Sequence, residues 1–353
     1  MISDSRAVEV AGRKIGPGEP CFIIAEAGCN HDGSLSKALQ LIDVAAQAGV
    51  DAVKFQTFDA DLLATEASPK AAYQLETTDA AESQHAMLRK LQLPRESFAE
   101  LAAHARGKGL MFLSTPFDEV SASVLASLNV PAFKLGSGEL THLPFLDRVA
   151  RYGRPMLVST GMARLSEIED AIGVIRQAGN PDVALFHAVS CYPADPADVN
   201  LRAMETMRRA FGVPVGYSDH TIGNAISVAA VALGACMIEK HFTLDRLAAG
   251  PDHRASAGPA ELTALVQEIR SVERALGHGR KIPAAAEADT RRVARRSVVA
   301  IRPIAAGKEI ARADLDVLRP GTGLEPRALP LIVGRRARTA IERGMLLSWD
   351  MIA

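Results

Sequence analysis

The sequence predicts a (β/α)8 barrel followed by a small C-terminal domain, and three observations support this fold class. Eight short apolar runs, each of strand length, alternate with longer helix-like stretches between residues 21 and 243. The runs are mainly apolar and do not alternate between apolar and polar residues, as in parallel strands that are buried on both faces. No GxGxxG or GxxxxGK loop is present, which makes an open doubly wound sheet the less favoured alternative.

The expected strands follow one another at regular intervals along the chain. They are 21–28, 52–58, 110–117, 132–138, 155–161, 183–190, 213–220 and 236–243. Helices are expected between them, among others over 34–49, 95–109, 165–179 and 224–235. Three of these four helical stretches end in glycine, a common stop signal, so each interval reads as one βα unit.

Composition sets limits on the class of protein. A chain of 353 residues with 48% hydrophobic content can bury one large core and still form a second domain. The four cysteines form no CxxC pair, so we expect no disulfide framework. Residues 1–16 lack a signal layout and no apolar run approaches the length of a membrane span, so we expect a cytoplasmic protein without membrane contact.

Charge is distributed unevenly along the chain. Residues 279–353 hold fifteen Lys or Arg against eight Asp or Glu, a net charge of +7, whereas residues 1–278 carry −8. We therefore expect a barrel over 1–278, a linker over 279–295 and a C-terminal domain over 296–353. The basic tail lacks the aromatic residues of a nucleic-acid reader, so we expect no nucleic-acid partner, and docking on an acidic surface or holding an anionic ligand fits it better.

Polar and charged side chains stand at the C-terminal ends of the expected strands, where barrel enzymes place their active sites. Hydroxyls there have a second explanation, because they also cap the following helices. Lysine and glutamate within apolar strands are harder to explain locally, since burying an unpaired charge is costly. In chain order the strand ends carry Glu26, Asn30 and His31; Lys54 and Gln56; Ser114 and Thr115; Lys134, Ser137 and Glu139; Ser159 and Thr160; Ser190 and Tyr192; Ser218, Asp219 and His220; Glu239, Lys240 and His241.

Two histidines end the last two strands. His220 and His241 would project into one cavity, where they fit equally well a pair of metal ligands or a pair of acid/base groups, with core packing as the third alternative. Lys54 and Lys134 predict an anion pocket for a phosphate or carboxylate, and their alternative role is ion pairing with Glu26 or Glu139. Hydroxyls expected in that pocket come from Thr115, Ser137, Ser190 and Ser218. The carboxylates Glu26, Glu139 and Asp252 are then left to hold hydroxyls or to move protons.

An ordered series of motifs resembles the sialic acid synthase family, which includes N-acetylneuraminate and legionaminate synthases. The motifs are AEAGCNHDG (25–33), VKFQTF (53–58), STPF (114–117), KLGSGE (134–139), STGM (159–162), YPADPADVNL (192–201), GYSDHT (216–221), EKHFT (239–243) and GPDH (250–253). Residues 296–326 are similar to the C-terminal SAF domain of that family, which is related to type III antifreeze protein. The resemblance therefore covers most of the chain.

The resemblance implies a condensation of phosphoenolpyruvate with the open-chain aldehyde of an N-acylated mannosamine-type sugar. A nine-carbon 2-keto acid and phosphate would form by C–O cleavage, with a divalent metal, Mn²⁺ or else Mg²⁺ or Co²⁺, on His220 and His241. Glu26 would manage the proton of the attacking water. Phosphoenolpyruvate would be bound by Lys54, Thr115, Lys134, Ser137, Ser190 and Ser218, and the sugar by Glu26, Gln56, Glu139, Tyr192, Asp252 and Arg319.

In this family the residue that matches Arg319 comes from the partner subunit of a domain-swapped homodimer, which the basic tail and acidic barrel would suit. Two positions depart from the pattern: Ala188 follows His187 where some members have cysteine, and Ser190 stands where some have asparagine. The motifs do not specify the acceptor, since N-acetylmannosamine, its 6-phosphate and 2,4-diacetamido-trideoxymannose differ by groups that one or two residues select. They do not specify the metal either.

Three alternative functions make different demands on the sequence. A related synthase, such as a pseudaminate synthase, would share the phosphoenolpyruvate pocket and differ in the sugar. A barrel metallohydrolase would carry an HxH motif on strand one, which here ends in Glu-Ala-Gly. A non-catalytic carbohydrate-binding protein would lack charges at the strand ends, and this sequence has them.

Overall fold

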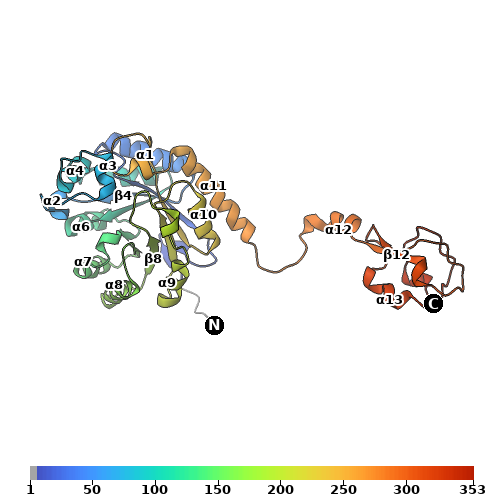
Figure 1. Ribbon diagram of the computed structural model, residues 1–353. Helices are drawn as coiled ribbons and strands as arrows, with labels where there is room; N and C mark the ends of the chain where they lie inside the picture. The colour runs from blue at the N-terminus through green and yellow to red at the C-terminus, as the bar shows by residue number, and fades with distance from the viewer. Residues whose placement is uncertain (1–5) are drawn as a thin grey trace. The chain divides into compact units, whose positions relative to one another are not determined.

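The computed structural model describes residues 6–353, so the first residues of the stretch without a signal layout lie outside it. The chain divides into two compact units, Met1–Gly277 and His278–Ala353. The first unit is a nearly closed barrel of eight parallel strands surrounded by helices, as the sequence predicts (Figure 1). Around the barrel the strand order is β5-β4-β3-β10-β9-β8-β7-β6.

All eight strands lie within the runs predicted from the sequence. They are β3 (Phe22–Gly28), β4 (Ala52–Thr57), β5 (Met111–Pro116), β6 (Phe133–Leu135), β7 (Met156–Ser159), β8 (Val183–Ala188), β9 (Val215–Asp219) and β10 (Met237–His241). Almost every strand residue is buried because the barrel core covers one face and the helix layer covers the other. The apolar runs therefore located the strands without showing which side chains point inward.

The helix layer consists of eight helices that each follow a strand. They are α1 (Leu35–Ala48), α5 (Ser97–Gly107), α6 (Glu119–Ser127), α7 (Leu143–Ala150), α8 (Leu165–Gln177), α9 (Ala203–Phe211), α10 (Ala225–Ala232) and α11 (Pro259–Leu276). Local signals set several of their ends. The Ser34 side chain caps the start of α1 by accepting from the Lys37 N–H, and Gly49 ends that helix with a left-handed φ of 78°.

Two features of this unit were not predicted. A hairpin of β1 (Val8–Val10) and β2 (Arg13–Ile15) precedes the barrel, and its buried side chains join the cluster formed by Phe22 and Met237 at the N-terminal ends of the strands. The β4–α5 connection contains three short helices, α2 (Ala60–Leu63), α3 (Ala72–Thr77) and α4 (Gln84–Leu91). These strands and helices are too short to produce a clear periodic pattern.

The second unit has a small core of its own. It begins with η4 (Ala285–Glu287) and α12 (Ala288–Ala294), continues with the antiparallel pair β11 (Ser297–Ala300) and β12 (Leu315–Leu318), and includes α13 (Leu329–Ile332). Isolated antiparallel β-bridges, such as that between Val299 and Leu346, connect further segments of this unit. Its buried residues include Val298, Ile304, Ile310, Ile332 and Leu347.

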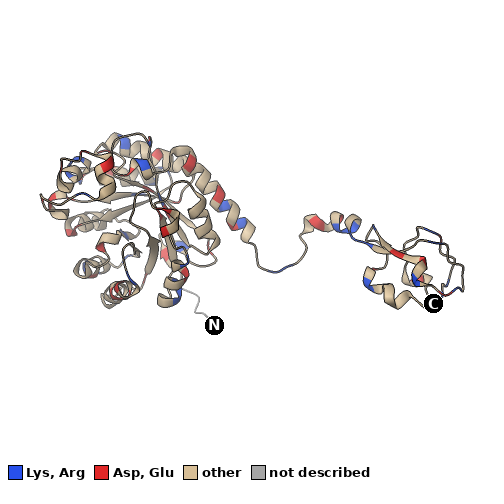
Figure 2. Ribbon diagram, in the orientation of Figure 1, with Lys and Arg blue, Asp and Glu red and all other residues tan. Residues whose placement is uncertain are grey.

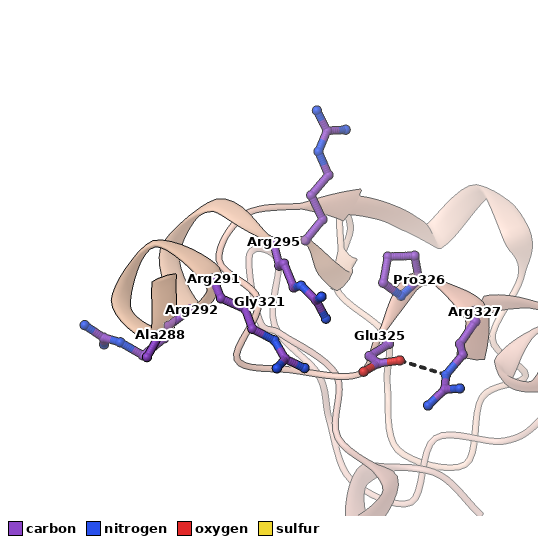
Figure 3. A pocket seen from close by; sticks show the side chains of 9 residues that line it. Ala288, Arg291, Arg292, Arg295, Gly321, Glu325, Pro326 and Arg327 are labelled. Carbon is purple, nitrogen blue, oxygen red and sulfur yellow. Dashed lines mark ion pairs between the residues drawn. The ribbon is translucent and has the colours of Figure 1, made fainter. Parts of the chain in front are cut away.

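Arginines gather on this second unit. Figure 2 shows α12 carrying an acidic residue followed by basic residues. A hollow of about 500 Å³ lies beside this helix and is lined by five arginines, whereas Glu325 is its one acidic lining residue among those described (Figure 3). Gly321, in the loop after β12, allows this loop to approach the end of α12 closely, because a Cβ there would lie 2.5 Å from the Arg295 Cβ. The lining residues are Ala288, Arg291, Arg292, Arg295, Arg296, Gly321, Glu325, Pro326 and Arg327.

In the part of the chain that the structure covers, none of the helices combines the length and hydropathy that crossing a bilayer requires.

Candidate active site

A hollow of about 390 Å³ opens at the C-terminal ends of the barrel strands. Side chains alternate in direction along a strand, so Ser218 of β9 and Glu239 and His241 of β10 point into the barrel. Every barrel strand, or the residues directly after it, contributes to the lining. The lining residues are Glu26, Lys54, Gln56, Ala71, Tyr73, Gln74, Gln84, Thr115, Phe117, Lys134, Gly136, Ser137, Gly138, Ser159, Met162, Ser190, Tyr192, Ser218, His220, Glu239 and His241.

Most of the predicted site residues meet in this hollow. Eleven of the fourteen line it: Glu26, Lys54, Gln56, Thr115, Lys134, Ser137, Ser190, Tyr192, Ser218, His220 and His241. Asp252 is buried just behind the lining, with its Oδ2 3.8 Å from His241 Nδ1. Glu139 is half-buried in the 3-10 turn Ser137–Glu139 and does not line the hollow. Arg319 is exposed and belongs to the second unit.

Two buried lysines share one buried carboxylate at the bottom of the hollow. Lys54 Nζ lies 2.8 Å from Glu26 Oε2 and 3.7 Å from Glu239 Oε2. Lys134 Nζ lies 3.4 Å from Glu239 Oε1, which also accepts a hydrogen bond of 2.8 Å from Ser218 Oγ. The alternative interpretation, ion pairing with Glu26 or Glu139, therefore holds for Lys54 and Glu26, whereas Lys134 pairs with Glu239 and not with Glu139.

Hydroxyl groups surround the two ammonium groups. Lys54 Nζ donates to Thr115 Oγ1 at 3.0 Å, and Lys134 Nζ donates to Ser159 Oγ at 2.7 Å. A Cβ on Gly161 would lie 2.3 Å from Ser190 Oγ and 2.8 Å from Ser137 Oγ, so the glycine lets these two hydroxyls approach its backbone. This side of the hollow offers two cations and several donors, a set that suits phosphate or carboxylate oxygens.

Burial and mutual attraction displace the pKa values of these groups in different directions. Burial raises the pKa of Glu26 to about 7, although Lys54 opposes the shift. Burial also opposes ionisation of Glu239, but Lys134 and Lys54 outweigh it and lower that pKa to about 2. The Lys134 pKa falls to about 8 because burial disfavours its charge more than Glu239 supports it. Near neutral pH the site therefore contains one ionised carboxylate, Glu239, and a second one, Glu26, that exchanges protons.

The two histidines stand side by side at the rim of this charge network, with ring centroids 5.5 Å apart. His220 Nδ1 donates to the Val189 carbonyl at 2.6 Å, which leaves Nε2 as the free base. Among the described residues His241 Nδ1 has no hydrogen-bond partner despite being buried. Burial lowers the pKa of both imidazoles, and it lowers that of His241 well below its usual value. Both rings are therefore neutral, the form that binds metal ions.

These groups fit a divalent cation with two protein ligands. The unpartnered nitrogen of His241 and the fixed tautomer of His220 supply two neutral nitrogen donors. Within residues 6–353 no cluster of three or more His, Cys, Asp or Glu forms that could hold a metal by itself. A cation at the two histidines would therefore complete its coordination with water or substrate.

The long β4–α5 connection reaches the histidines through aromatic side chains. Tyr192 packs on His220 with centroids 4.1 Å apart, and Tyr73 of α3 packs on Tyr192 at 5.1 Å. Lys70 holds this connection together, because its Nζ donates to Thr78 Oγ1 at 2.8 Å and pairs with Glu82 at 2.9 Å. Tyr73, Gln74 and Gln84 thereby reach the lining of the hollow.

Sequence reasoning gave no role to Glu239, although it was noted at a strand end. The signal was a glutamate in an apolar strand two residues before a histidine, a spacing that places both side chains on one face. Tyr73, Gln74 and Gln84 gave no such signal, because they lie on the short helices α3 and α4 of a long connection and not at a strand end.

The fold and this hollow define a (β/α)8 barrel enzyme with a charged, histidine-bearing mouth and an appended β module. Residues 41–281 match the model of the NeuB family, and residues 295–353 match that of the SAF domain. The chain therefore belongs to the NeuB family of sialic acid synthases and is an enzyme of the synthase class.

Three relatives illustrate the similarity. The N,N'-diacetyllegionaminic acid synthase of Legionella pneumophila is 44% identical, over 94% of this chain and 94% of that protein. The human N-acetylneuraminate-9-phosphate synthase is 36% identical, over 97% of this chain and 95% of that protein. A crystal structure of the N-acetylneuraminic acid synthetase of Leptospira borgpetersenii, in complex with citrate, has a TM-score of 0.71 and 35% identity, over 81% of this chain and 95% of that one.

Proposed function

We propose that the protein condenses phosphoenolpyruvate with the open-chain aldehyde of an N-acylated mannosamine-type sugar and with water. The products are phosphate and a nine-carbon 2-keto acid of the sialic acid type. The observation that carries the proposal is the placement of two buried lysines and two neutral histidines in one hollow of a NeuB family barrel. Such a hollow can hold an anionic substrate beside an activated carbonyl group.

Phosphoenolpyruvate would occupy the lysine side of the hollow. Its phosphate and carboxylate need several cationic or hydroxyl donors, which Lys54, Lys134 and the nearby hydroxyls of Thr115, Ser137 and Ser190 can supply. Ser218 lies next to Glu239 at the same place. Both lysines already face a carboxylate, so the anion would add to a network whose charges are partly balanced.

A divalent cation, for which we propose Mn²⁺, would be held by His220 and His241. When bound it would polarise the aldehyde oxygen of the sugar as a Lewis acid. The protein holds the two imidazoles neutral by burial, and it keeps Nε2 of His220 free by engaging Nδ1 with Val189.

Glu26 is suited to proton transfer at the reacting carbon. In the proposed reaction C3 of phosphoenolpyruvate attacks the aldehyde carbon, and water adds to the cationic C2 that results. The bond between C2 and the phosphate oxygen then breaks and releases phosphate, while the hydroxyl on C2 loses its proton and becomes the keto group. The former aldehyde oxygen takes up a proton and becomes a hydroxyl. With a pKa of about 7, Glu26 can accept the proton of that water, and Gln56 Nε2 orients its carboxylate by donating to Oε1 at 3.2 Å.

The acceptor sugar would lie between the histidines and the outer wall of the hollow. Gln56 and Tyr192 line this region, Asp252 lies behind His241, and Glu139 is half-buried beside the lining residue Ser137. We further propose a domain-swapped homodimer in which the partner subunit's Arg319 reaches the acylamino group. The higher identity to the legionaminic acid synthase favours 2,4-diacetamido-2,4,6-trideoxymannose over N-acetylmannosamine or its 6-phosphate.

Phosphate release tests this proposal directly. The purified protein is incubated with phosphoenolpyruvate, Mn²⁺ and one sugar at a time from a panel of the three N-acyl sugars, mannose and arabinose 5-phosphate, with EDTA controls. We expect release with one hexosamine and its loss in EDTA. Release with arabinose 5-phosphate alone would identify a different synthase, and no release with any sugar from a folded protein would contradict the proposal.

A further inference from the structure

A second charged pair lies directly behind the two histidines, on the opposite face of the same strands. Asp219 of β9 and Lys240 of β10 are register partners, and Lys240 Nζ lies 2.9 Å from Asp219 Oδ2. Both side chains are buried, with 0% and 1% of their surface exposed. Neither belongs to the described lining of the hollow, because alternation turns them outward toward the helix layer. Each directly precedes one of the histidines in the sequence.

The ammonium group of Lys240 is fully used by hydrogen bonds. Besides Asp219 it donates to the carbonyl oxygens of Thr221 at 2.5 Å and Gly223 at 2.9 Å. Three donors thus meet three acceptors, all in or beside the segment that links β9 to α10. Lys240 therefore ties β10 to the backbone that follows His220.

Both carboxylate oxygens of Asp219 also accept hydrogen bonds from other groups. Its Oδ1 accepts from the Thr221 N–H at 2.8 Å and the Thr221 hydroxyl at 2.7 Å. Its Oδ2 accepts from the Ser227 hydroxyl in the first turn of α10 at 2.6 Å. The turn that begins at His220 is therefore closed by the carboxylate of the residue before it and anchored to the helix layer.

Stability alone does not account for such a pair. Desolvating two charges is costly, and apolar replacements of buried ion pairs are often neutral or stabilising. The outward position two residues before Lys240 is the apolar Ile238, and the one two residues before Asp219 is Tyr217, whose hydroxyl also donates to Asp219 Oδ1 at 3.3 Å. What distinguishes this pair is where its bonds lead. They tie Lys240 of β10 to Asp219 and to the backbone after β9, and so they hold the two strand ends that carry His220 and His241 relative to each other.

We propose that Lys240 and Asp219 are positioning residues that set the separation and orientation of His220 and His241 for a divalent cation. This inference rests on the metal role proposed above for the two histidines. Groups that hydrogen-bond directly to a metal-ligating side chain commonly change metal affinity by about 10–100-fold when they are removed. Lys240 and Asp219 act one step further away, through the backbone, so we expect an effect at the lower end of that range. The pair acts on the histidines through the backbone. A hydrogen bond from Asn30 Nδ2 to the carbonyl of Phe242, the residue directly after β10, at 2.8 Å supports the chain just beyond His241.

The test compares three variants of the full-length protein. Lys240→Met removes the charge and the three hydrogen bonds, and Asp219→Asn keeps the shape of the side chain while removing its charge. Arg270→Met is the control: Arg270 also has several partners, namely Cys21 O at 2.8 Å and Asp51 Oδ2 at 2.9 Å, but these precede the starts of β3 and β4 at the opposite end of the barrel. Mn²⁺ affinity is measured by calorimetry without substrates, thermal stability by calorimetric Tm, and the imidazole nitrogens by NMR of ¹⁵N-histidine-labelled protein without metal.

We expect Kd for Mn²⁺ to rise about 10-fold or more in Lys240→Met and Asp219→Asn, and to stay unchanged in Arg270→Met. The His220 and His241 nitrogen shifts should change in the first two variants alone. Unchanged Kd and unchanged shifts in a folded Asp219→Asn variant would overturn the inference.

The control also separates this inference from the metal role on which it rests. If the unaltered protein binds no Mn²⁺, the metal role fails, and the histidine shifts still decide whether the pair positions the rings. If all three variants lose Mn²⁺ affinity in proportion to their loss of Tm, the effect is general destabilisation, and the positioning role is contradicted.

Discussion

Two hollows of the molecule concentrate cations, but they differ in burial. One is the hollow at the C-terminal ends of the barrel strands, called here the barrel mouth, and the other is the hollow beside α12 that five arginines line, called here the arginine hollow. At the mouth, Lys54 and Lys134 are almost completely buried and are held by carboxylates. In the arginine hollow, Arg291 and Arg295 are exposed, and water screens their charges. Low dielectric at the mouth raises the Glu26 pKa to about 7 and lowers the Lys134 pKa to about 8. In this protein the charged groups whose pKa values move toward neutral pH are therefore those that the barrel shields from water.

The largest difference between the two regions should appear when a histidine is replaced. We expect His220→Ala or His241→Ala to abolish Mn²⁺ binding and to lower kcat/KM by at least about 100-fold, because a neutral nitrogen donor is lost at a buried site. The matched control is His278→Ala, an exposed histidine of the second unit, which should behave as the unaltered protein. Circular dichroism and Tm check that the barrel stays folded. Full activity of either barrel variant would remove the metal-pair assignment.

The contribution of a buried carboxylate to the free energy of unfolding can be compared with that of an exposed one. Glu239→Gln leaves Lys134 without its ionised partner, and we expect the free energy of unfolding in urea to fall by about 3–5 kcal/mol. Glu325→Gln breaks an exposed pair with Arg327, and we expect about 0–1 kcal/mol. Equal losses in the two variants would show that burial does not distinguish the two regions.

Glu26 gives a prediction about pH. Its pKa in the folded protein is about 7, above the value of 4.5 for an exposed glutamate, so the folded state holds the proton more tightly than the unfolded state does. The stabilisation from this group is therefore complete below about pH 4.5 and is lost as pH rises through about 7. We expect Glu26→Gln to lose that part of the pH dependence of the Tm, together with any rise of kcat/KM through about pH 7. A variant with the unaltered pH profile and rate would exclude Glu26 as the proton acceptor.

An exposed cation of the second unit should produce the smallest catalytic effect. We expect Arg319→Ala to raise the KM for the sugar about 10-fold, as the loss of one charged hydrogen bond would, while the KM for phosphoenolpyruvate changes little. Arg327→Ala, in the same unit, serves as the control. Steady-state kinetics with each substrate varied in turn make the comparison. A KM for the sugar that does not change would argue against the proposed role of the partner's Arg319.

The sequence by itself located all eight strands and most residues at the mouth. Continuous apolar runs identify strands that are buried on both faces, and a lysine or glutamate within such a run has few purely structural explanations. The positions of Lys54, Lys134, His220 and His241 at the strand ends were therefore predictable from local pattern, and their roles stay predictions. The hairpin Val8–Ile15 and helices α2, α3 and α4 were not predicted, because short elements give weak periodic signals.

Only the tertiary structure decided which charges share a partner and which face each charge takes. Glu239 and Lys240 are neighbours in sequence, yet one enters the hollow between two lysines and the other supports the strands from behind. A strand buried on both faces loses the alternation of polar and apolar residues that would reveal its inward side. The direction of each side chain follows from strand register and barrel closure, which depend on residues far apart along the chain.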